Sequence, residues 1–242
     1  AGRRARMTAD TAATPQDPAA TPPDPAATRP LAAALEPIRL CLVSHTNAGK
    51  TTLARTLLRR SVGEVGDRAH VTEVAERFEW IATPDGDVLE VWDTPGFGDS
   101  VRLLKRLRAS GNPLGWFLSV VWDRWTDRPF YSSQQALKAA RDSADVVLYV
   151  ASAAEDPRAA AYVEPELEIL DWLDKPVCVA LNQLGELDAA TAAEDLRRWR
   201  EALAGRARVV DVLALDAFTR CWVHEHVLLA RLAPHVPGAK RA

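Results

Sequence analysis

The chain has 242 residues, enough for one large domain or for one domain with appendages. Hydrophobic residues make up 48% of it, so a sizeable core can form, and the net charge of −3 argues against a globally basic nucleic-acid-binding protein. No run approaches the roughly 18 apolar residues of a membrane-spanning helix. The three cysteines have no metal-ligand spacing and are expected to be free thiols in a reducing cytosol.

Residues 1–37 are rich in Ala, Thr, Pro and Asp and carry almost no large apolar side chains. Such a segment cannot bury enough surface to offset its ordering entropy, so a disordered tail is predicted. The basic residues near its start are not followed by an apolar segment, so the pattern does not indicate a secretory signal.

A strand is predicted at about 38–43 and an amphipathic helix at about 50–60. Between them, residues 44–51 have the sequence S-H-T-N-A-G-K-T. This matches the phosphate-loop pattern G-x-x-x-x-G-K-[ST] except at the first glycine, which is Ser44 here.

Three residues of this stretch carry its chemistry. Gly49 lets backbone N–H groups curl around an anion, Lys50 reaches the β- and γ-phosphates, and the Thr51 hydroxyl ligates Mg²⁺. The helix that begins at Lys50 also points its positive end at the phosphates. The stretch therefore predicts nucleotide binding, with a plain strand-to-helix turn as the alternative.

Residues 61–72 are polar, contain two glycines and predict a mobile loop. Strands are predicted at 74–80 and 88–92, and the turn residues P-D-G-D at 84–87 between them indicate a hairpin.

The second strand of this hairpin leads directly into D-T-P-G at residues 93–96. An acidic residue at this place, Asp93, fits the second carboxylate of a phosphate-loop Mg²⁺ site. The Gly96 N–H would be free to meet a γ-phosphate. Alone, D-T-P-G also forms an ordinary turn, but its position after the phosphate loop and the hairpin favours the metal site.

Residues 99–131 predict a helical insert. One helix is expected to bury Val101, Leu104 and Leu107, opposite Arg102, Lys105, Arg106 and Arg108. A second amphipathic helix is expected with its apolar residues at Leu114, Phe117, Leu118, Val121, Trp122 and Trp125. Three interpretations stay open: a peripheral membrane contact, a face for a protein partner or a homodimer, and a lid packed on the domain's own core. A cytoplasmic location is expected, and a nucleic-acid partner is not indicated.

The remaining chain alternates between helices and strands. Helices are predicted near 133–143, 159–173, 189–204 and 218–232, and strands at 145–151, 177–181 and 208–215. The third of these helices is expected to turn Ala193, Leu196, Trp199 and Leu203 inward. The alternation predicts an α/β fold with a mainly parallel sheet, helices on both faces and the hairpin as an antiparallel edge. The phosphate loop, Asp93 and Asn182 would then meet at the carboxyl ends of the strands.

These motifs resemble translation-factor-type small GTPases of the Era and TrmE branch, over about residues 38–233. The branch carries G-x-P-N-x-G-K-[ST] and D-T-P-G. The insert and the L-D-A-F at 215–218 are similar to bacterial GTPases of unassigned role that usually carry a further C-terminal domain of unknown function. Residues 234–242 would then be a tail at a truncation point. The resemblance implies a three-layer Ras-like G domain with a six-stranded sheet.

The resemblance also implies a slow, Mg²⁺-dependent GTPase that acts as a molecular switch. It assigns the nucleotide to Asn47, Ala48, Gly49, Lys50, Thr51, Thr52, Gly96, Asn182, Gln183, Asp216 and Ala217. It assigns Mg²⁺ to Thr51, Thr72 and, through water, Asp93. The expected catalytic residues are Lys50, Asn47 and Thr72.

Two positions depart from the expected pattern. Phe97 follows Gly96 where Ras-like proteins place a glutamine that orients the attacking water, which a phenyl ring cannot do. In the Era and TrmE branch, an asparagine at the Asn47 position helps to hold K⁺ beside the phosphates, so stimulation by K⁺ or by dimerisation is a hypothesis. The alternative is that Asn47 only caps the loop.

The second departure is the guanine motif N-K-x-D, which appears here as N-Q-L-G at residues 182–185. Loss of the aspartate removes the main discriminator between guanine and adenine. Glu186, Asp188 or Asp216 could supply a displaced carboxylate, and Ala217 fits the alanine whose N–H meets the guanine oxygen. The alternative function is a nucleotide-binding regulator or scaffold with negligible hydrolysis or relaxed GTP/ATP selectivity, acting through the insert.

Overall fold

The computed structural model describes residues 36–58, 75–109, 111–119, 127–184, 189–215, 217 and 222–240, without side chains at 189 and 222–224. By their internal contacts, residues 1–33 and 34–242 form two separate units, and every described residue belongs to the second. The mobile loop predicted at 61–72 and nearly all of the predicted tail lie outside the described residues.

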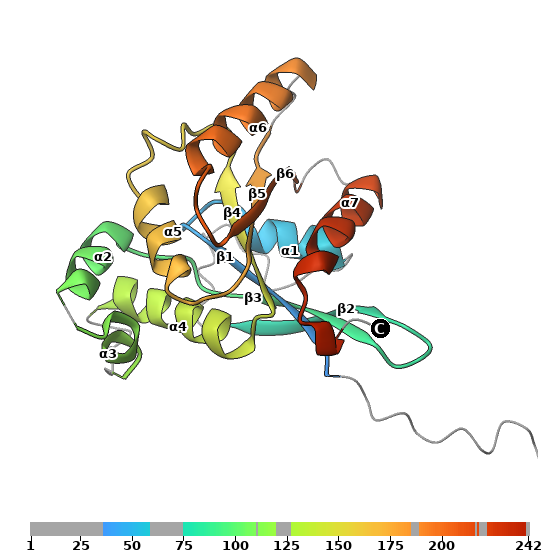
Figure 1. Ribbon diagram of the computed structural model, residues 1–242, viewed down its shortest axis with the longest axis horizontal. Helices are drawn as coiled ribbons and strands as arrows, with labels where there is room; N and C mark the ends of the chain where they lie inside the picture. Colours follow the sequence, from blue (N-terminus) through green and yellow to red (C-terminus); the bar gives the residue numbers. More distant parts are fainter. Residues whose placement is uncertain are drawn as a thin grey trace, which may run out of the picture. The chain divides into compact units, whose positions relative to one another are not determined.

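The described strands form a mixed sheet in the order β2-β3-β1-β4-β5-β6 (Figure 1). The strands are β1 (Ile38–Ser44), β2 (Glu76–Ala82), β3 (Val88–Asp93), β4 (Val146–Ser152), β5 (Val177–Asn182) and β6 (Val209–Ala214). Strand β2 pairs with β3 in antiparallel orientation, and the other neighbouring strands are parallel. The predicted Ras-like α/β fold with one antiparallel edge strand is confirmed.

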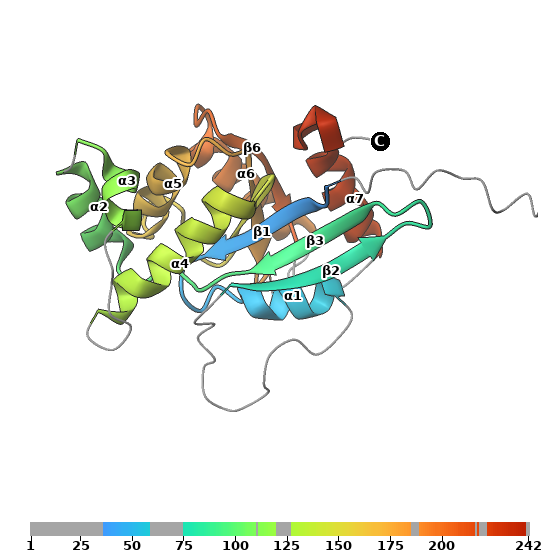
Figure 2. The ribbon, with the colours of Figure 1, turned by 90° about the horizontal axis from the view of Figure 1, so that it is seen from below.

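Helices cover both faces of this sheet. They are α1 (Lys50–Leu58), α2 (Ser100–Arg108), α3 (Pro113–Ser119), α4 (Arg128–Ser143), α5 (Val163–Asp171), α6 (Ala189–Leu203) and α7 (Trp222–Leu232), followed by the 3-10 turns η1 (Ala233–His235) and η2 (Gly238–Lys240). Helices α1 and α7 share one hydrophobic core with the sheet, and α2 to α6 share the other. The arrowheads of β1 and β3 point toward the end where α2 and α3 lie (Figure 2).

The central strands explain why two cores form. Every residue of β4 and β5 is buried, as expected for parallel strands that helices cover on both faces. Successive side chains of β4 alternate, with Val147 and Tyr149 in the α2–α6 core and Val146 and Leu148 in the α1/α7 core. Cys41 and Cys178 are buried free thiols, as predicted.

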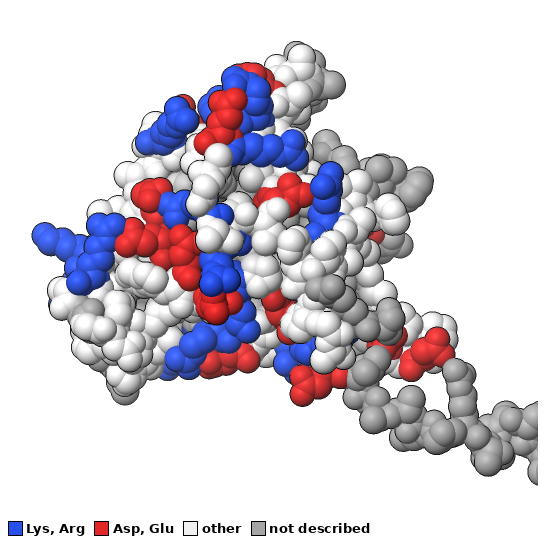
Figure 3. Space-filling model, viewed as in Figure 1, with Lys and Arg blue, Asp and Glu red and all other residues white. Residues whose placement is uncertain are grey.

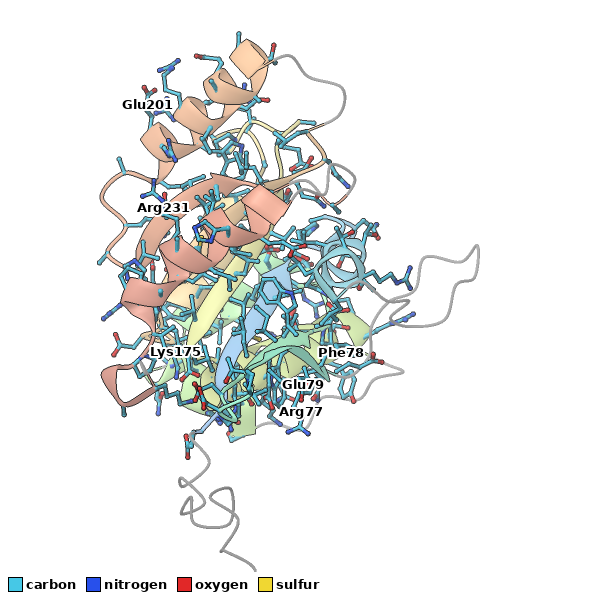
Figure 4. All side chains as sticks on the ribbon, turned by 90° about the vertical axis from the view of Figure 1, so that its right-hand side faces the viewer. Arg77, Phe78, Glu79, Lys175, Glu201 and Arg231 are labelled. Atoms are coloured by element: carbon cyan, nitrogen blue, oxygen red, sulfur yellow. The ribbon has the colours of Figure 1, made fainter. Side chains whose placement is uncertain are left out.

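Strand β2 forms an exposed edge. Most of its side chains are exposed or half-buried, and its register against β3 shifts between Glu79 and Ile81. The labelled β2 residues Arg77 and Glu79 lie toward the bottom of Figure 4, and Glu201 of α6 lies toward the top, at opposite edges of the sheet. The irregular register and the charged residues hinder pairing with another strand.

The described part of the helical insert packs on the domain itself. Leu103, Leu104 and Leu107 of α2 are buried in the α2–α6 core, together with Phe117 and Leu118 of α3. This arrangement is the one expected of a lid. The part of the second predicted helix that includes Val121, Trp122 and Trp125 lies outside the described residues.

The prediction that Val101 faces inward is wrong, because its side chain is 52% exposed. Leu103 takes the inward place, since the buried stripe of α2 follows positions 103, 104 and 107. Lys and Arg side chains gather over α2 at the left of Figure 3. Helix α2 thus buries leucines and exposes four basic residues, Arg102, Lys105, Arg106 and Arg108.

Several boundaries also differ from the prediction. Helix α4 begins at Arg128, five residues earlier than expected, because Pro129 suits the first turn of a helix. Helix α5 begins only at Val163, since residues before it form turns such as the Ala159 N–H to Asp156 carbonyl bond. Ala193 is exposed on α6 rather than buried, because the buried face of α6 includes Asp195 instead.

No helix in the described part of the chain is long and apolar enough to cross a membrane.

Candidate functional site

The phosphate loop connects β1 to α1 at the carboxyl end of β1. Its first half is held by local bonds to the His45 carbonyl, which accepts from the Ser44 hydroxyl at 2.7 Å and from the Ala48 N–H at 3.4 Å. Gly49, with φ of +83°, then turns the chain into α1. This positive φ explains why the loop needs glycine there.

Lys50, Thr51 and Asp93 form one polar cluster at the start of α1. The Lys50 ammonium donates to Asp93 Oδ1 at 2.6 Å, and the Thr51 hydroxyl donates to Asp93 Oδ2 at 2.8 Å. Lys50 is 6% exposed and Asp93 is 1% exposed, so the ion pair is almost fully desolvated. The sequence predicted these three residues to act together, and the fold brings them together.

The cluster fits a divalent cation by its chemistry. A hydroxyl and a carboxylate converge within hydrogen-bond distance, and Mg²⁺ prefers such hard oxygen ligands. Thr51 and Asp93 would hold the ion, and a bound Mg²⁺ would neutralise charge on the phosphate oxygens. Lys50 would then exchange its partner Asp93 for a phosphate.

The D-T-P-G segment lies directly against the phosphate loop. The Thr94 hydroxyl donates to the Leu42 carbonyl of β1 at 2.7 Å. A Cβ added to Gly96 would lie 3.0 Å from the Thr46 Cα, so glycine permits the close approach of the two backbones. The predicted contact of the Gly96 N–H with a γ-phosphate stays a prediction.

Phe97 connects this segment to the phosphate loop more firmly still. Its N–H donates to the Ser44 carbonyl at 2.8 Å, and its carbonyl accepts from the Thr46 hydroxyl at 2.6 Å. The phenyl ring is fully buried in the α2–α6 core. The ring therefore anchors this segment in the core.

Asn182, at the end of β5, links the phosphate loop to the segment that follows β6. Its side-chain amide donates to the Ala48 carbonyl at 3.0 Å, and its side-chain oxygen accepts from the Ala217 N–H at 2.9 Å. The residue is fully buried. The Ala217 N–H, expected to meet a guanine oxygen, already has an acceptor in this structure.

Three further residues predicted to bind the nucleotide, Asn47, Thr52 and Gln183, are exposed or half-buried. Asn47 is exposed with φ of +69°, and Thr52 lies half-buried in the first turn of α1. Gln183 has φ of +59° and places its side-chain amide 3.5 Å from the Asn47 carbonyl. Thr72 and Asp216, predicted for Mg²⁺ and the base, lie outside the described residues, as do Gly185, Glu186 and Asp188.

A second cluster beside the loop was not predicted. His45 Nδ1 lies 2.7 Å from Glu166 Oε1, and the Tyr149 hydroxyl donates to Glu166 Oε2 at 2.8 Å. The His45 ring stacks on the Tyr162 ring with centroids 4.0 Å apart. Tyr162 in turn donates to Glu155.

Burial determines the electrostatics of this cluster. Glu166 is fully buried, and burial raises its pKa despite the opposing hydrogen bonds from His45 and Tyr149. Burial lowers the pKa of His45, but the hydrogen bond to Glu166 and the charges of Glu166 and Glu155 outweigh it, so this pKa is raised above 6.5. A signal existed in the sequence, because Glu166 occupies an inward position of α5 between the buried Val163 and Leu170.

Residues 39–183, well over half of the chain, match the 50S ribosome-binding GTPase family. The chain belongs to this family of P-loop GTPases. No curated protein matches the sequence.

Solved structures agree on the fold. Era from Aquifex aeolicus bound to GDP and AlF4⁻ is 18% identical over 83% of this chain and 57% of its own, with a TM-score of 0.60. Era in complex with MgGDPNP and nucleotides 1506–1542 of 16S ribosomal RNA is 19% identical over 84% of this chain and 58% of its own, with a TM-score of 0.60. The bacterial selenocysteine-specific elongation factor EF-Sec is 16% identical over 83% of this chain and 29% of its own, with a TM-score of 0.55. The chain thus spans less than two thirds of each of these proteins.

Proposed function

We propose that the protein is a GTP-hydrolysing molecular switch. The observation that carries the proposal is the cluster of Lys50, Thr51 and Asp93 at the start of α1, which joins the expected phosphate ligand to both described Mg²⁺ ligands. Family membership supports GTP as the nucleotide. Lys50 and the amides of the loop bind the phosphates, and the predicted Thr72 completes the Mg²⁺ ligands.

The proposed turnover is slow. The residue after Gly96 is Phe97, whose ring is buried and offers no group to orient an attacking water. We retain K⁺ as the proposed stimulant, held by the exposed Asn47 at the rim of the loop. Such a cation would supply positive charge to the developing transition state. Equal rates in KCl and NaCl, with Asn47→Ala unaltered, would contradict this part.

Selectivity for the base is proposed to be relaxed. Both polar groups of the Asn182 side chain are occupied within the protein, one by the phosphate loop and one by Ala217. The aspartate that pairs with guanine is absent from the motif, where Gly185 stands. A displaced carboxylate at Asp216 would restore selectivity for GTP over ATP.

The alternative is a nucleotide-binding regulator with negligible hydrolysis. The observation that favours it is the double backbone bond of Phe97 to Ser44 and Thr46, which restrains the segment that would have to rearrange between nucleotide states. Its output would be a protein partner, a second copy of the chain or a membrane surface at the insert.

One set of measurements separates these proposals. Affinities for GTP, GDP, ATP and ADP with Mg²⁺ define the base selectivity, and single-turnover assays with GTP and ATP define hydrolysis. Lys50→Ala should abolish both binding and turnover, whereas Lys105→Ala, an exposed lysine on α2, should change neither. Tight binding without turnover would favour the regulator, and no binding to any nucleotide would overturn both proposals.

A further inference from the structure

One face of α2 presents a row of basic side chains to solvent. Arg102 and Arg106 are four residues apart, and Lys105 lies beside them on the exposed face. Both guanidinium groups lie over the ring of the buried Phe130, at 4.6 and 5.3 Å from its centroid. The ring therefore holds two positive charges side by side, and like charges at this helical spacing repel each other. A bound anion relieves this repulsion.

Nearby carboxylates neutralise only part of this charge. Asp127 lies 3.9 Å from Arg102, and Arg108, in the last turn of α2, is paired with Glu168 of α5. Asp99 uses its side chain to cap α2, where it accepts from the Arg102 N–H. The exposed face of α2 keeps a net positive charge, because its four basic residues outnumber these three carboxylates.

Apolar side chains are exposed in the same part of the molecule. Of the four large apolar side chains that are exposed in the described residues, two are Val101 of α2, at 52%, and Trp116 of α3, at 37%. Helix α3 itself, Pro113–Ser119, includes no charged residue. Figures 1 and 2 both show α2 and α3 beside each other, and in Figure 3 the basic side chains over α2 border an uncharged area over α3. Positive charge and an exposed tryptophan therefore meet on one surface.

We propose that this surface docks the protein on a membrane that contains anionic phospholipids. The insert surface consists of Val101, Arg102, Lys105 and Arg106 of α2 and Trp116 of α3. The basic groups bind headgroup phosphates, and the tryptophan ring enters the boundary between headgroups and acyl chains, where its amphipathic ring is favoured. The proposal rests on the insert as the docking surface named for the alternative function above, and it does not require GTP hydrolysis.

The combination of residues favours lipid over a nucleic acid or an acidic protein. A phosphate backbone offers no apolar partner to Val101, and protein interfaces are depleted of lysine, whereas α2 exposes Lys105. A membrane interface accepts both kinds of side chain. The leucines of α2 stay buried in the α2–α6 core, so the contact is peripheral and chiefly electrostatic. It should therefore weaken as salt screens the charges.

The test is sedimentation of the full chain, without nucleotide, with vesicles of phosphatidylglycerol and phosphatidylcholine in equal amounts. The protein should bind these vesicles and not vesicles of phosphatidylcholine alone. Raising the salt from about 0.1 M to about 1 M should release it, because the Debye length falls from about 10 Å to about 3 Å.

The double variant Lys105→Gln/Arg106→Gln should bind the anionic vesicles about 25-fold more weakly, since each basic residue near an anionic surface contributes about fivefold. The matched control is Arg77→Gln/Arg197→Gln, which removes the same charge from exposed arginines of β2 and α6 and should keep the wild-type affinity. Equal losses in the two double variants would show attraction by overall charge alone and would overturn the proposal.

The apolar contribution is tested by Val101→Gln/Trp116→Gln, which keeps every charge. Its vesicle affinity should fall about tenfold or more, the usual gain from burying a large apolar side chain, and urea midpoints check that the variants are folded. A wild-type affinity in both this variant and Lys105→Gln/Arg106→Gln would overturn the proposal.

Competition with a nucleic acid distinguishes the other class of partner, with polyuridylic acid as the probe. Binding to polyuridylic acid that Lys105→Gln/Arg106→Gln abolishes, without binding to anionic vesicles, would assign the surface to a nucleic acid and overturn the membrane proposal. Failure to bind any vesicle would overturn it as well. Neither result would affect the proposed GTPase, because its binding and turnover assays use no lipid.

Discussion

Gly49 meets two requirements at once, and only glycine can satisfy them. Its φ is +83°, which other residues rarely adopt, and a Cβ there would lie 2.4 Å from Asn182 Nδ2. The same Asn182 amide donates to the Ala48 carbonyl, so a displaced Asn182 would also disturb the loop. Backbone conformation and packing therefore both constrain this position.

Gly49→Ala should accordingly unfold more easily and bind nucleotides poorly. Positive φ at a non-glycine residue costs about 1–2 kcal/mol, and the clash adds to this cost. We expect at least a tenfold loss of GDP affinity in a binding titration, alongside a lower urea midpoint. The matched control is Gly205→Ala, at φ of +91° with open space around its Cβ, which should lose stability alone. Equal affinities in the two variants would contradict the close-approach argument.

At the scale of the element, α2 divides into a buried and an exposed face. Leu107 is fully buried in the α2–α6 core, whereas Val101 is 52% exposed on the same helix. Arg108 reaches across to Glu168, so α2 is also paired with α5 through charge. Surface ion pairs contribute little, so the leucines should hold the insert in place.

Leu107→Ala should therefore lower the free energy of unfolding by about 2–5 kcal/mol, the usual cost of truncating a buried leucine. Val101→Ala should change it by less than about 0.5 kcal/mol, because the position is exposed. Urea denaturation followed by circular dichroism measures both. A small effect of Leu107→Ala would mean that the insert does not depend on this packing and is not a fixed lid.

At the scale of the whole sheet, the end opposite the phosphate loop is held by Lys240. Its ammonium donates to both oxygens of Asp145, at 3.0 and 2.8 Å, and to the Pro37 carbonyl at 3.0 Å. Asp145 Oδ2 also accepts from the Arg39 N–H at 2.8 Å. Lys240, which lies in the stretch expected to be a tail, thus makes a contact that joins the segments before β1 and β4.

Lys240→Met should lower the free energy of unfolding by about 2 kcal/mol, because hydrogen bonds to charged groups are worth roughly that amount. Nucleotide affinity should stay unchanged, since the phosphate loop lies at the other end of β1. Lys105→Met, at an exposed lysine of α2, provides the control and should leave the urea midpoint unchanged. A change in GDP affinity for Lys240→Met would show that the two ends of the sheet are coupled.

Local patterns were sufficient for much of this fold. The apolar runs of β4 and β5, the turn of the hairpin and the G-K-T motif are each contained within a few neighbouring residues. Periodicity was less reliable at helix ends and faces, where Val101 and Ala193 proved exposed. Those positions depend on which neighbouring helix covers them, and a helical repeat does not contain that information.

By itself, the sequence determined that a phosphate loop at 44–51 and an acidic residue, Asp93, would meet at the carboxyl ends of parallel strands, because motif spacing and strand order impose it. The tertiary structure alone decided which groups surround them. It brought Glu166 of α5 within hydrogen-bond distance of His45. It also paired the side-chain amide and the side-chain oxygen of Asn182 with backbone groups of the protein. The reason is physical: these partners lie more than thirty residues apart in the chain, so only the packing of helices on the sheet brings them together.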